Sequence, residues 1–323
     1  MKKTLQVLLG AVFLVTEFFV LTLPLLTTSA KADGAIQAIT HAGFGGGTDV
    51  TTRMMLLRTR RYLKQDMQLV NKKGGGGATS MDYMMTLPAD GQHTLTWTTG
   101  HAVSMALGKT KVKLSDMQPL ARGTDDPQLF VVNCKNDIKD AKKFVSAQKS
   151  KSLKYGTTHV GGIDDVSAIA FTKKGKLTDP TIVAYKGVAP IKTNLIKGDI
   201  DVGVLNLGEA VTEIEDGTLC VAVVLASKRM DKLSNVPTAT ELGIPVVLST
   251  VRGFVTRKGV PADRAKQLED AMIKAMEHKY FQSFLTDIGL DATSVVGADE
   301  WGKQMEVMLA EMSSQLKALG YIK

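Results

Sequence analysis

Four short segments of this sequence combine glycine with small polar residues, which are the residue types that bind anions through the backbone. They read GFGGGTD (residues 43–49), TTGHA (98–102), TTHVGGIDD (157–165) and NLGEA (206–210). Glycine lets the backbone approach a ligand closely, and the N–H groups at the start of a helix attract a carboxylate or a phosphate. The four segments therefore predict a site for a small anion.

The candidate ligand-binding residues lie in these segments and on one later strand. They are Phe44, Gly46, Gly47, Thr48, Asp49, Thr99, His101, Thr157, Thr158, Gly161, Gly162, Asp165, Asn206 and Arg252. Two of them have ordinary structural alternatives, because Asp49 can cap its own helix and Asn206 can tie down its own loop. Arg252 is either a surface charge or a cleft residue that pairs with an anion, and we favour the cleft.

The sequence lacks the common motifs of nucleophilic, metal and nucleotide chemistry. It contains no G-x-S-x-G, H-E-x-x-H, G-x-x-x-x-G-K-[ST] or Cys-x-x-Cys segment, and its glycine runs do not match G-x-G-x-x-G. The five histidines share no ligand spacing, and His101 and His159 are the best placed, each after a predicted strand. We therefore predict a protein that is not an enzyme and has no metal and no cofactor. An exported enzyme that uses His101 or His159 as its base is the least favoured alternative.

The elements that must position these residues alternate between short apolar runs and helical patterns. Predicted strands lie at residues 35–42, 67–71, 94–99, 127–133, 153–158, 181–187, 201–207, 219–227 and 246–256. Alternation of this kind is typical of a mostly parallel sheet covered by helices. The four glycine-containing segments follow the carboxyl ends of such strands, where open α/β sheets bind their ligands.

The order of elements restarts near residue 130, which predicts two similar α/β units. We expect an α/β protein of two lobes, residues 33–131 plus 254–323 and residues 132–253, joined by two crossing strands. A cleft between the lobes is the predicted binding site. The last helix has an apolar stripe that is typical of packing against a domain; it consists of Trp301, Met305, Met308, Met312, Leu316 and Leu319.

The first 32 residues have the layout of an export signal. Lys2 and Lys3 precede an apolar run at residues 5–26, and small residues follow, ending at Ala32. This pattern predicts a signal peptide that is cleaved after Ala32. A retained membrane anchor is the alternative, and Glu17 within the apolar run together with the Ala-x-Ala end favours cleavage.

The net charge of the chain indicates which class of ligand it binds. The formal net charge is +8, and removal of residues 1–32 leaves 37 basic and 31 acidic residues, or +6. The basic residues are scattered and do not gather with aromatic residues, so nucleic-acid binding is not predicted, whereas a mild positive field favours a small anionic ligand.

Cys134 and Cys220 are the only cysteines in the sequence. Both alternatives for them remain open, a disulfide between the two or two buried free thiols.

Four longer segments carry a family resemblance. In order they are GFGGGTDVTTR, YGTTHVGGIDDVSAIAF, VAYKGVAPIKTNLIKGDIDVGVLN and VLASKRMDKLSNVPTATELGI. They resemble the solute-binding receptors of tripartite tricarboxylate transporters, also called Bug-type proteins. The resemblance implies a type II periplasmic-binding-protein fold, a periplasmic location, and delivery of a small carboxylate to membrane permease subunits. It also implies that backbone N–H groups and waters at Phe44 to Asp49 and at Thr157 to Asp165 hold the ligand.

Two positions depart from the pattern of that family. Phe44 stands where proline is usual, and Asp165 stands where histidine is frequent. A carboxylate at residue 165 repels an anion unless it caps its helix, pairs with a basic group or meets an ammonium on an amino-acid-like ligand. Capping is the commonest use, so we expect a di- or tricarboxylate. A ligand-binding partner of a membrane sensor kinase is the second functional hypothesis.

Overall fold

The computed structural model of the chain describes residues 34–158, 160–318 and 320–322. The predicted signal peptide, residues 1–32, lies outside the described residues. His159 and Leu319, two residues that the sequence singled out, also lie outside them. The remaining predictions fall within the unit that spans residues Gly34–Lys323.

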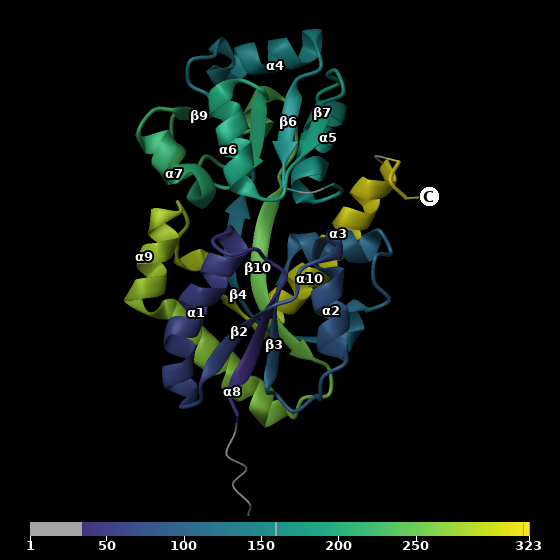
Figure 1. Cartoon of the computed structure of the whole chain (residues 1–323), viewed down its shortest axis with the longest axis vertical. Coiled ribbons are helices and arrows are strands. Elements are labelled where there is room, and N and C mark those ends of the chain that lie inside the picture. Colours follow the sequence, from purple (N-terminus) through teal and green to yellow (C-terminus); the bar gives the residue numbers. More distant parts are fainter. Residues whose placement is uncertain (1–33, 159, 319, 323) are drawn as a thin grey trace, which may run out of the picture. The chain divides into compact units, whose positions relative to one another are not determined.

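The strands form two separate sheets (Figure 1). The first sheet has the order β11-β4-β10-β3-β1-β2 and the second has the order β7-β6-β8-β5-β9. The strands of the first sheet are β1 (Ile36–Thr40), β2 (Met67–Asn71), β3 (His93–Thr98), β4 (Met117–Pro127), β10 (Ser249–Arg257) and β11 (Val296–Gly297). The strands of the second are β5 (Leu129–Asn133), β6 (Lys154–Thr157), β7 (Thr181–Ala184), β8 (Val202–Leu205) and β9 (Leu219–Val224).

Helices follow most of the strands and pack on the sheets. They are α1 (Gly47–Leu63), α2 (Ala78–Met85), α3 (Thr99–Ala106), α4 (Ala141–Ser150), α5 (Ile163–Lys174), α6 (Val188–Lys197), α7 (Leu207–Glu215), α8 (Ala262–Glu277), α9 (Lys279–Asp287) and α10 (Ala298–Ala318). β1 pairs in parallel with both β2 and β3, and β6 pairs in parallel with β7 and β8. Within each sheet these parallel strands place the starts of α1, α3, α5 and α7 at the same edge.

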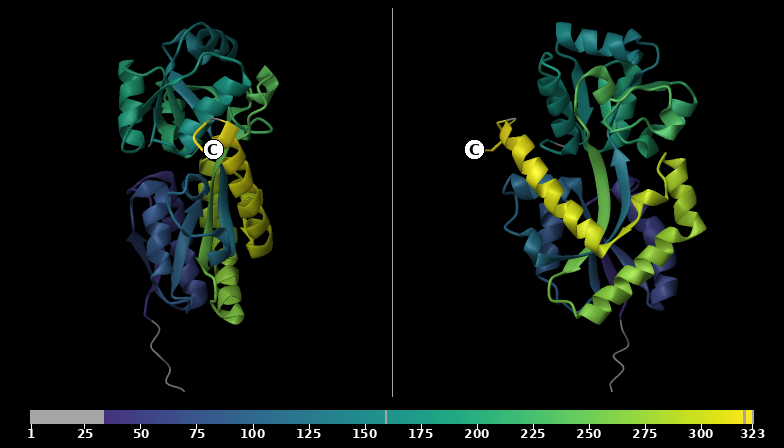
Figure 2. Two further views of the ribbon diagram at one scale, coloured as in Figure 1. Left: turned by 90° about the vertical axis from the view of Figure 1, so that its right-hand side faces the viewer. Right: turned by 180° about the vertical axis from the view of Figure 1, so that it is seen from behind.

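Two long antiparallel strands connect the two sheets. β4 pairs with β10 from Met117 opposite Arg257 to Pro127 opposite Ser249. β5 begins in the second sheet at Leu129, directly after β4 ends, and β10 brings the chain back after β9. Figures 1 and 2 show β4 and β10 running side by side from one sheet toward the other. The predicted α/β class with two lobes and two crossing strands is confirmed, and the residue boundaries of the lobes stay a prediction.

The stripe of the last helix faces the core, as predicted. In α10 the residues Trp301, Met305, Met308, Met312 and Leu316 are buried, and Figure 2 shows this helix in yellow beside the crossing strands. The contact with β10 is close at Gly253, where a Cβ atom would lie 2.3 Å from the ring of Trp301. Only glycine lets the helix approach the strand at this point.

A disulfide joins Cys134 to Cys220 with a Cα–Cα distance of 5.0 Å. It decides between the two alternatives that the sequence left open. Cys134 directly follows β5, and Cys220 lies in β9, which pairs antiparallel with β5. The bond therefore links neighbouring strands of the second sheet and closes a loop of 86 residues that contains the rest of that sheet.

Candidate functional site

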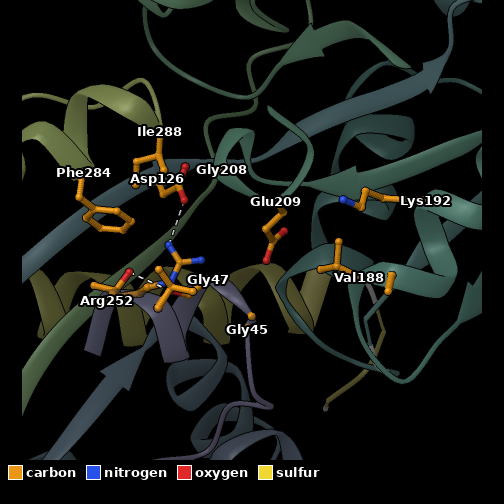
Figure 3. Close-up of a pocket in the computed structure, with 14 residues that line it drawn as sticks. Gly45, Gly47, Asp126, Val188, Lys192, Gly208, Glu209, Arg252, Phe284 and Ile288 are labelled. Carbon is orange, nitrogen blue, oxygen red and sulfur yellow. Dashed lines mark hydrogen bonds and ion pairs between the residues drawn. The ribbon is translucent and has the colours of Figure 1, made fainter. Parts of the chain in front are cut away.

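A cavity of about 320 Å³ lies where the starts of three helices meet the crossing strands (Figure 3). This volume is at the lower end of the usual range for ligand pockets, which suits a small molecule. Its walls come from α1, α6, α7 and α9 and from residues of β4 and β10. They are Gly45, Gly46, Gly47, Val50, Thr51, Asp126, Val188, Ala189, Lys192, Gly208, Glu209, Arg252, Phe284 and Ile288.

The glycine run before α1 forms one wall of the cavity. Gly45 has a φ of +75°, a left-handed conformation that glycine adopts without strain. Its N–H donates to Oδ2 of Asp49 at 3.1 Å, and the guanidinium of Arg53 donates to the same oxygen at 2.9 Å. Burial acts to raise the pKa of Asp49, but the hydrogen bonds from Arg53 and Gly45 lower it below its usual value. Asp49 therefore has a structural role, because it fixes the loop before the N-cap residue Gly46.

The loop before α5 has the same construction. Gly161 has a φ of +67°, and its N–H donates to Oδ2 of Asp165 at 2.6 Å. The spacing between glycine and aspartate is four residues, as it is between Gly45 and Asp49. Asp165 thus fixes the loop before the N-cap residue Gly162, and its expected capping of α5 stays a prediction. The residues of this loop do not line the cavity.

Arg252 on β10 holds the centre of the site together. The residue is only 2% exposed, and its side chain donates to groups on three other elements. Nε donates to Oγ1 of Thr48 at 3.2 Å, Nη1 to Oδ2 of Asp126 at 3.0 Å, and Nη2 to Oδ1 of Asn206 at 3.3 Å. Arg252 is therefore a residue of the cavity wall, and it connects the start of α1 with the start of α7.

Two acidic side chains also line the cavity, and neither was among the site residues predicted from the sequence. Asp126 directly precedes Pro127, the last residue of β4, and it is 3% exposed. Burial raises its pKa to about 7, because Arg252 only partly offsets the cost of a buried charge and Glu209 adds to that cost. Glu209 lies in the first turn of α7, where its Oε2 accepts from the N–H of Asn206 at 3.1 Å. Burial raises the pKa of Glu209 as well, and Arg252 partly offsets the effect.

His101 and Thr99 make structural hydrogen bonds in and beside the first sheet. The Nδ1 of His101 accepts from the N–H of Thr98 at 3.0 Å, so its proton lies on Nε2, which is 3.0 Å from Oγ of Ser80. Burial lowers the pKa of His101 well below its usual value. The hydroxyl of Thr99 donates to the carbonyl of Ser249 and accepts from the backbone N–H of Val251. Neither residue lines the cavity.

The structure brings together only some of the predicted site residues. Gly46, Gly47 and Arg252 line the cavity. Thr48 and Asn206 accept hydrogen bonds from the side chain of Arg252. Phe44 is 76% exposed, with the cations of Arg53 and Lys73 each 5.6 Å from its ring centroid. Thr48 and Asn206 do not line the cavity, and neither do the remaining predicted residues, which are Phe44, Asp49, Thr99, His101, Thr157, Thr158, Gly161, Gly162 and Asp165. Their contact with a ligand stays a prediction.

Metal-binding clusters and membrane-spanning helices are absent from the part of the chain that the structure describes. That part contains no group of three or more His, Cys, Asp or Glu side chains arranged to hold a metal ion. Its helices include none that is both long enough and apolar enough to cross a membrane.

Comparisons with known proteins place this architecture in a family. Residues 51–319 match the family described as "Tripartite tricarboxylate transporter family receptor". The chain is 26% identical over 219 residues to protein BugT of Bordetella pertussis, which covers 65% of this chain and 66% of BugT.

Two solved structures share the fold. MatC of Rhodopseudomonas palustris with bound malate has a TM-score of 0.78 at 22% identity, covering 87% of this chain and 98% of MatC. Rpa4515 of R. palustris with adipate has a TM-score of 0.79 at 21% identity, covering 88% of this chain and 97% of Rpa4515. The structural matches confirm the predicted fold, and the family match confirms the predicted family. The chain belongs to the receptor family of the tripartite tricarboxylate transporters.

Proposed function

We propose that this chain is a non-enzymatic receptor that binds a small carboxylate in the cavity and delivers it to the permease subunits of a tripartite tricarboxylate-type transporter. The observation that carries the proposal is the convergence of the starts of α1, α6 and α7 with Arg252 on one cavity. Helix starts present free N–H groups and positive partial charge. Together they can bind the carboxylates of a di- or tricarboxylate. The malate and adipate bound to the two structural relatives support a ligand of this size.

The crossing strands supply a hinge for closing the cavity. β4 and β10 are the two strands that lead from one sheet to the other, and Asp126 and Arg252 lie on them. Bending of such strands closes the lobes of a two-lobed receptor on its ligand. Closure excludes water from the carboxylates and strengthens the interactions that hold them.

The disulfide supports a location outside the cytoplasm. Disulfides persist in oxidising compartments such as the bacterial periplasm and are rare in the cytoplasm. The bond between Cys134 and Cys220 agrees with the predicted signal peptide. We therefore propose that the mature receptor is periplasmic.

The cavity wall at Gly47 gives a direct test of the site. A Cβ atom on Gly47 would lie 2.5 Å from Nη2 of Arg252 and 3.4 Å from Oε1 of Glu209. Because crowding of this kind costs about 1–3 kcal/mol, Gly47→Val is expected to weaken dicarboxylate binding by about 10- to 100-fold. Gly43→Val is the matched control, since a Cβ there makes only ordinary contact with Lys73. Calorimetric titration of both variants measures the effect. Equal affinities of the two variants would show that the ligand does not bind in this cavity.

The ionisation of Asp126 predicts a pH dependence of binding. The charged groups that act on it are Arg252, Glu209 and Asp125, and its pKa is about 7. Below that pH Asp126 is neutral and the cavity is less negative, so a dicarboxylate binds more tightly. Its affinity is expected to fall as the pH rises from about 6 to about 8, by at most about tenfold per pH unit. The measurement is calorimetry with adipate at three pH values. An affinity that is constant, or that rises with pH, would contradict this effect of Asp126, and Asp126→Asn should flatten the slope.

A further inference from the structure

The cavity contains groups for binding a cation as well as groups for binding an anion. Arg252 and the helix starts attract carboxylates, but Asp126 and Glu209 line the same cavity (Figure 3). Lys192 is the other basic side chain of the wall, and its Nζ is 2.6 Å from Oε1 of Glu213. The positive charge of Lys192 is therefore already engaged. A purely anionic ligand would meet two acidic side chains with a single buried guanidinium between them.

One oxygen of Asp126 lacks a hydrogen-bond donor. Oδ2 accepts from Arg252, whereas Oδ1 accepts no hydrogen bond from any of the described residues. The side chain is almost wholly buried and belongs to the cavity wall. A buried acceptor without a donor is costly. A ligand that donates a hydrogen bond to this oxygen would remove that cost.

Glu209 lies at the position where a ligand carboxylate would approach α1. Its Oε1 is close to Gly47, the first residue of that helix, and the backbone N–H of Gly47 acts to lower the pKa of Glu209. A ligand that carries only carboxylates must compete with this side chain for the helix start. A ligand with a cationic nitrogen next to a carboxylate is instead held by both groups.

We propose that the ligand is an amino-substituted dicarboxylate, whose ammonium is bound by Glu209 and by Oδ1 of Asp126 while its carboxylates meet Arg252 and the helix starts. This inference rests on the proposed function and specifies the ligand class of the same site. The sequence had suggested Asp165 as one position that could meet an ammonium. In the structure Asp165 accepts from the N–H of Gly161, and Glu209 and Asp126 provide the acidic groups of the cavity.

Matched ligand pairs test the proposal by calorimetry. The pairs are succinate and aspartate, glutarate and glutamate, and adipate and 2-aminoadipate, so that each pair differs in the amino group. A charge-assisted hydrogen bond contributes about 1.5–3 kcal/mol, so the amino member of the best-fitting pair should bind about 10- to 100-fold more tightly. Glu209→Gln should reduce that preference by about tenfold or more. The substitution keeps the helix cap, because a glutamine oxygen can still accept from the N–H of Asn206.

Controls separate this effect from a general loss of charge or of folding. Glu215→Gln makes the same change at an exposed position of α7 and should leave the preference unchanged. Asp126→Asn is a second variant, and it should also reduce the preference. Equal binding of both members of every pair, tighter binding of the unsubstituted member, or an unchanged preference in Glu209→Gln would overturn the inference while leaving the receptor function intact. If no member of any pair binds the wild type, the proposed function fails and the inference fails with it.

Discussion

Arg252→Met is expected to lower the free energy of unfolding by about 3–5 kcal/mol and to abolish carboxylate binding. The side chain of Arg252 is 3% exposed and pairs with Asp126, which is itself almost wholly buried. Its loss leaves that carboxylate without a cation in a poorly solvated position. The same substitution removes the donors to Thr48 and Asn206 that hold the starts of α1 and α7 together. Denaturant unfolding and calorimetric titration measure the two effects separately.

The pH dependence of this destabilisation has a definite sign. Burial already raises the pKa of Asp126 to about 7, from 3.8 for an exposed aspartate, and the loss of Arg252 raises it further. A carboxyl group whose pKa is raised in the folded state contributes less stability as the pH rises between the unfolded and folded values. The variant should therefore be closest to wild type near pH 5, where Asp126 is protonated, and furthest from it near pH 8.

A second substitution separates the stability effect from the binding effect. In the double variant Arg252→Met with Asp126→Leu, an apolar pair replaces the ion pair, and such replacements are often neutral or stabilising. The double variant should recover most of the stability and none of the binding. Arg60→Met, at an exposed position of α1, should change stability by no more than about 0.5 kcal/mol. A single variant with wild-type stability and affinity would show that Arg252 does not organise the site.

Removal of the disulfide has the second large expected effect. The double variant Cys134→Ser and Cys220→Ser opens a loop of 86 residues, and loss of a native disulfide of this kind typically costs about 2–5 kcal/mol. The unfolding midpoint should fall in the double variant, and reduced wild type should match it. If reduction left the midpoint unchanged, the pairing of Cys134 with Cys220 would not stabilise the folded chain.

Ligand affinity should survive the loss of the disulfide under conditions where the variant remains folded. Strand pairing places Leu129 opposite Leu205, two residues before the start of α7, whereas Cys134 lies past the other end of β5. The bond is thus far along the strand from the cavity. A large loss of affinity in the folded variant would show that the disulfide positions the site as well as stabilising the second sheet.

Hydrophobic pattern predicted most of the fold, and its failure at one strand is informative. The predicted strand at 67–71 agrees with β2 (Met67–Asn71). β4, which spans Met117–Pro127, was not predicted, because its sequence MQPLARGTDDP contains two prolines and three charged residues. A strand between two lobes carries polar side chains into a site, so it lacks the apolar alternation that identifies an ordinary strand.

The site was predicted only in part, because some of its residues have a recognisable sequence pattern and others do not. Glycine loops have a visible pattern, so the wall at Gly46 and Gly47 was found, and a lone arginine in an apolar run drew attention to Arg252. Asp126 lies in the strand that had no readable pattern. Glu209 lies in the segment NLGEA, which the sequence did single out, but glutamate three residues after asparagine at a helix start is an ordinary cap. Contacts between residues distant in sequence, such as Arg252 with Asp126, are needed to see the cavity.

Calorimetric titration of the purified protein with plain and amino-substituted dicarboxylates, followed by recovery of the ligand, tests the receptor function most directly. The predicted result is saturable binding of one molecule per chain, with the ligand recovered chemically unchanged and with the amino-substituted members bound most tightly. Absence of binding by every compound, or recovery of a chemically altered product, would contradict the assignment of this chain as a carboxylate receptor.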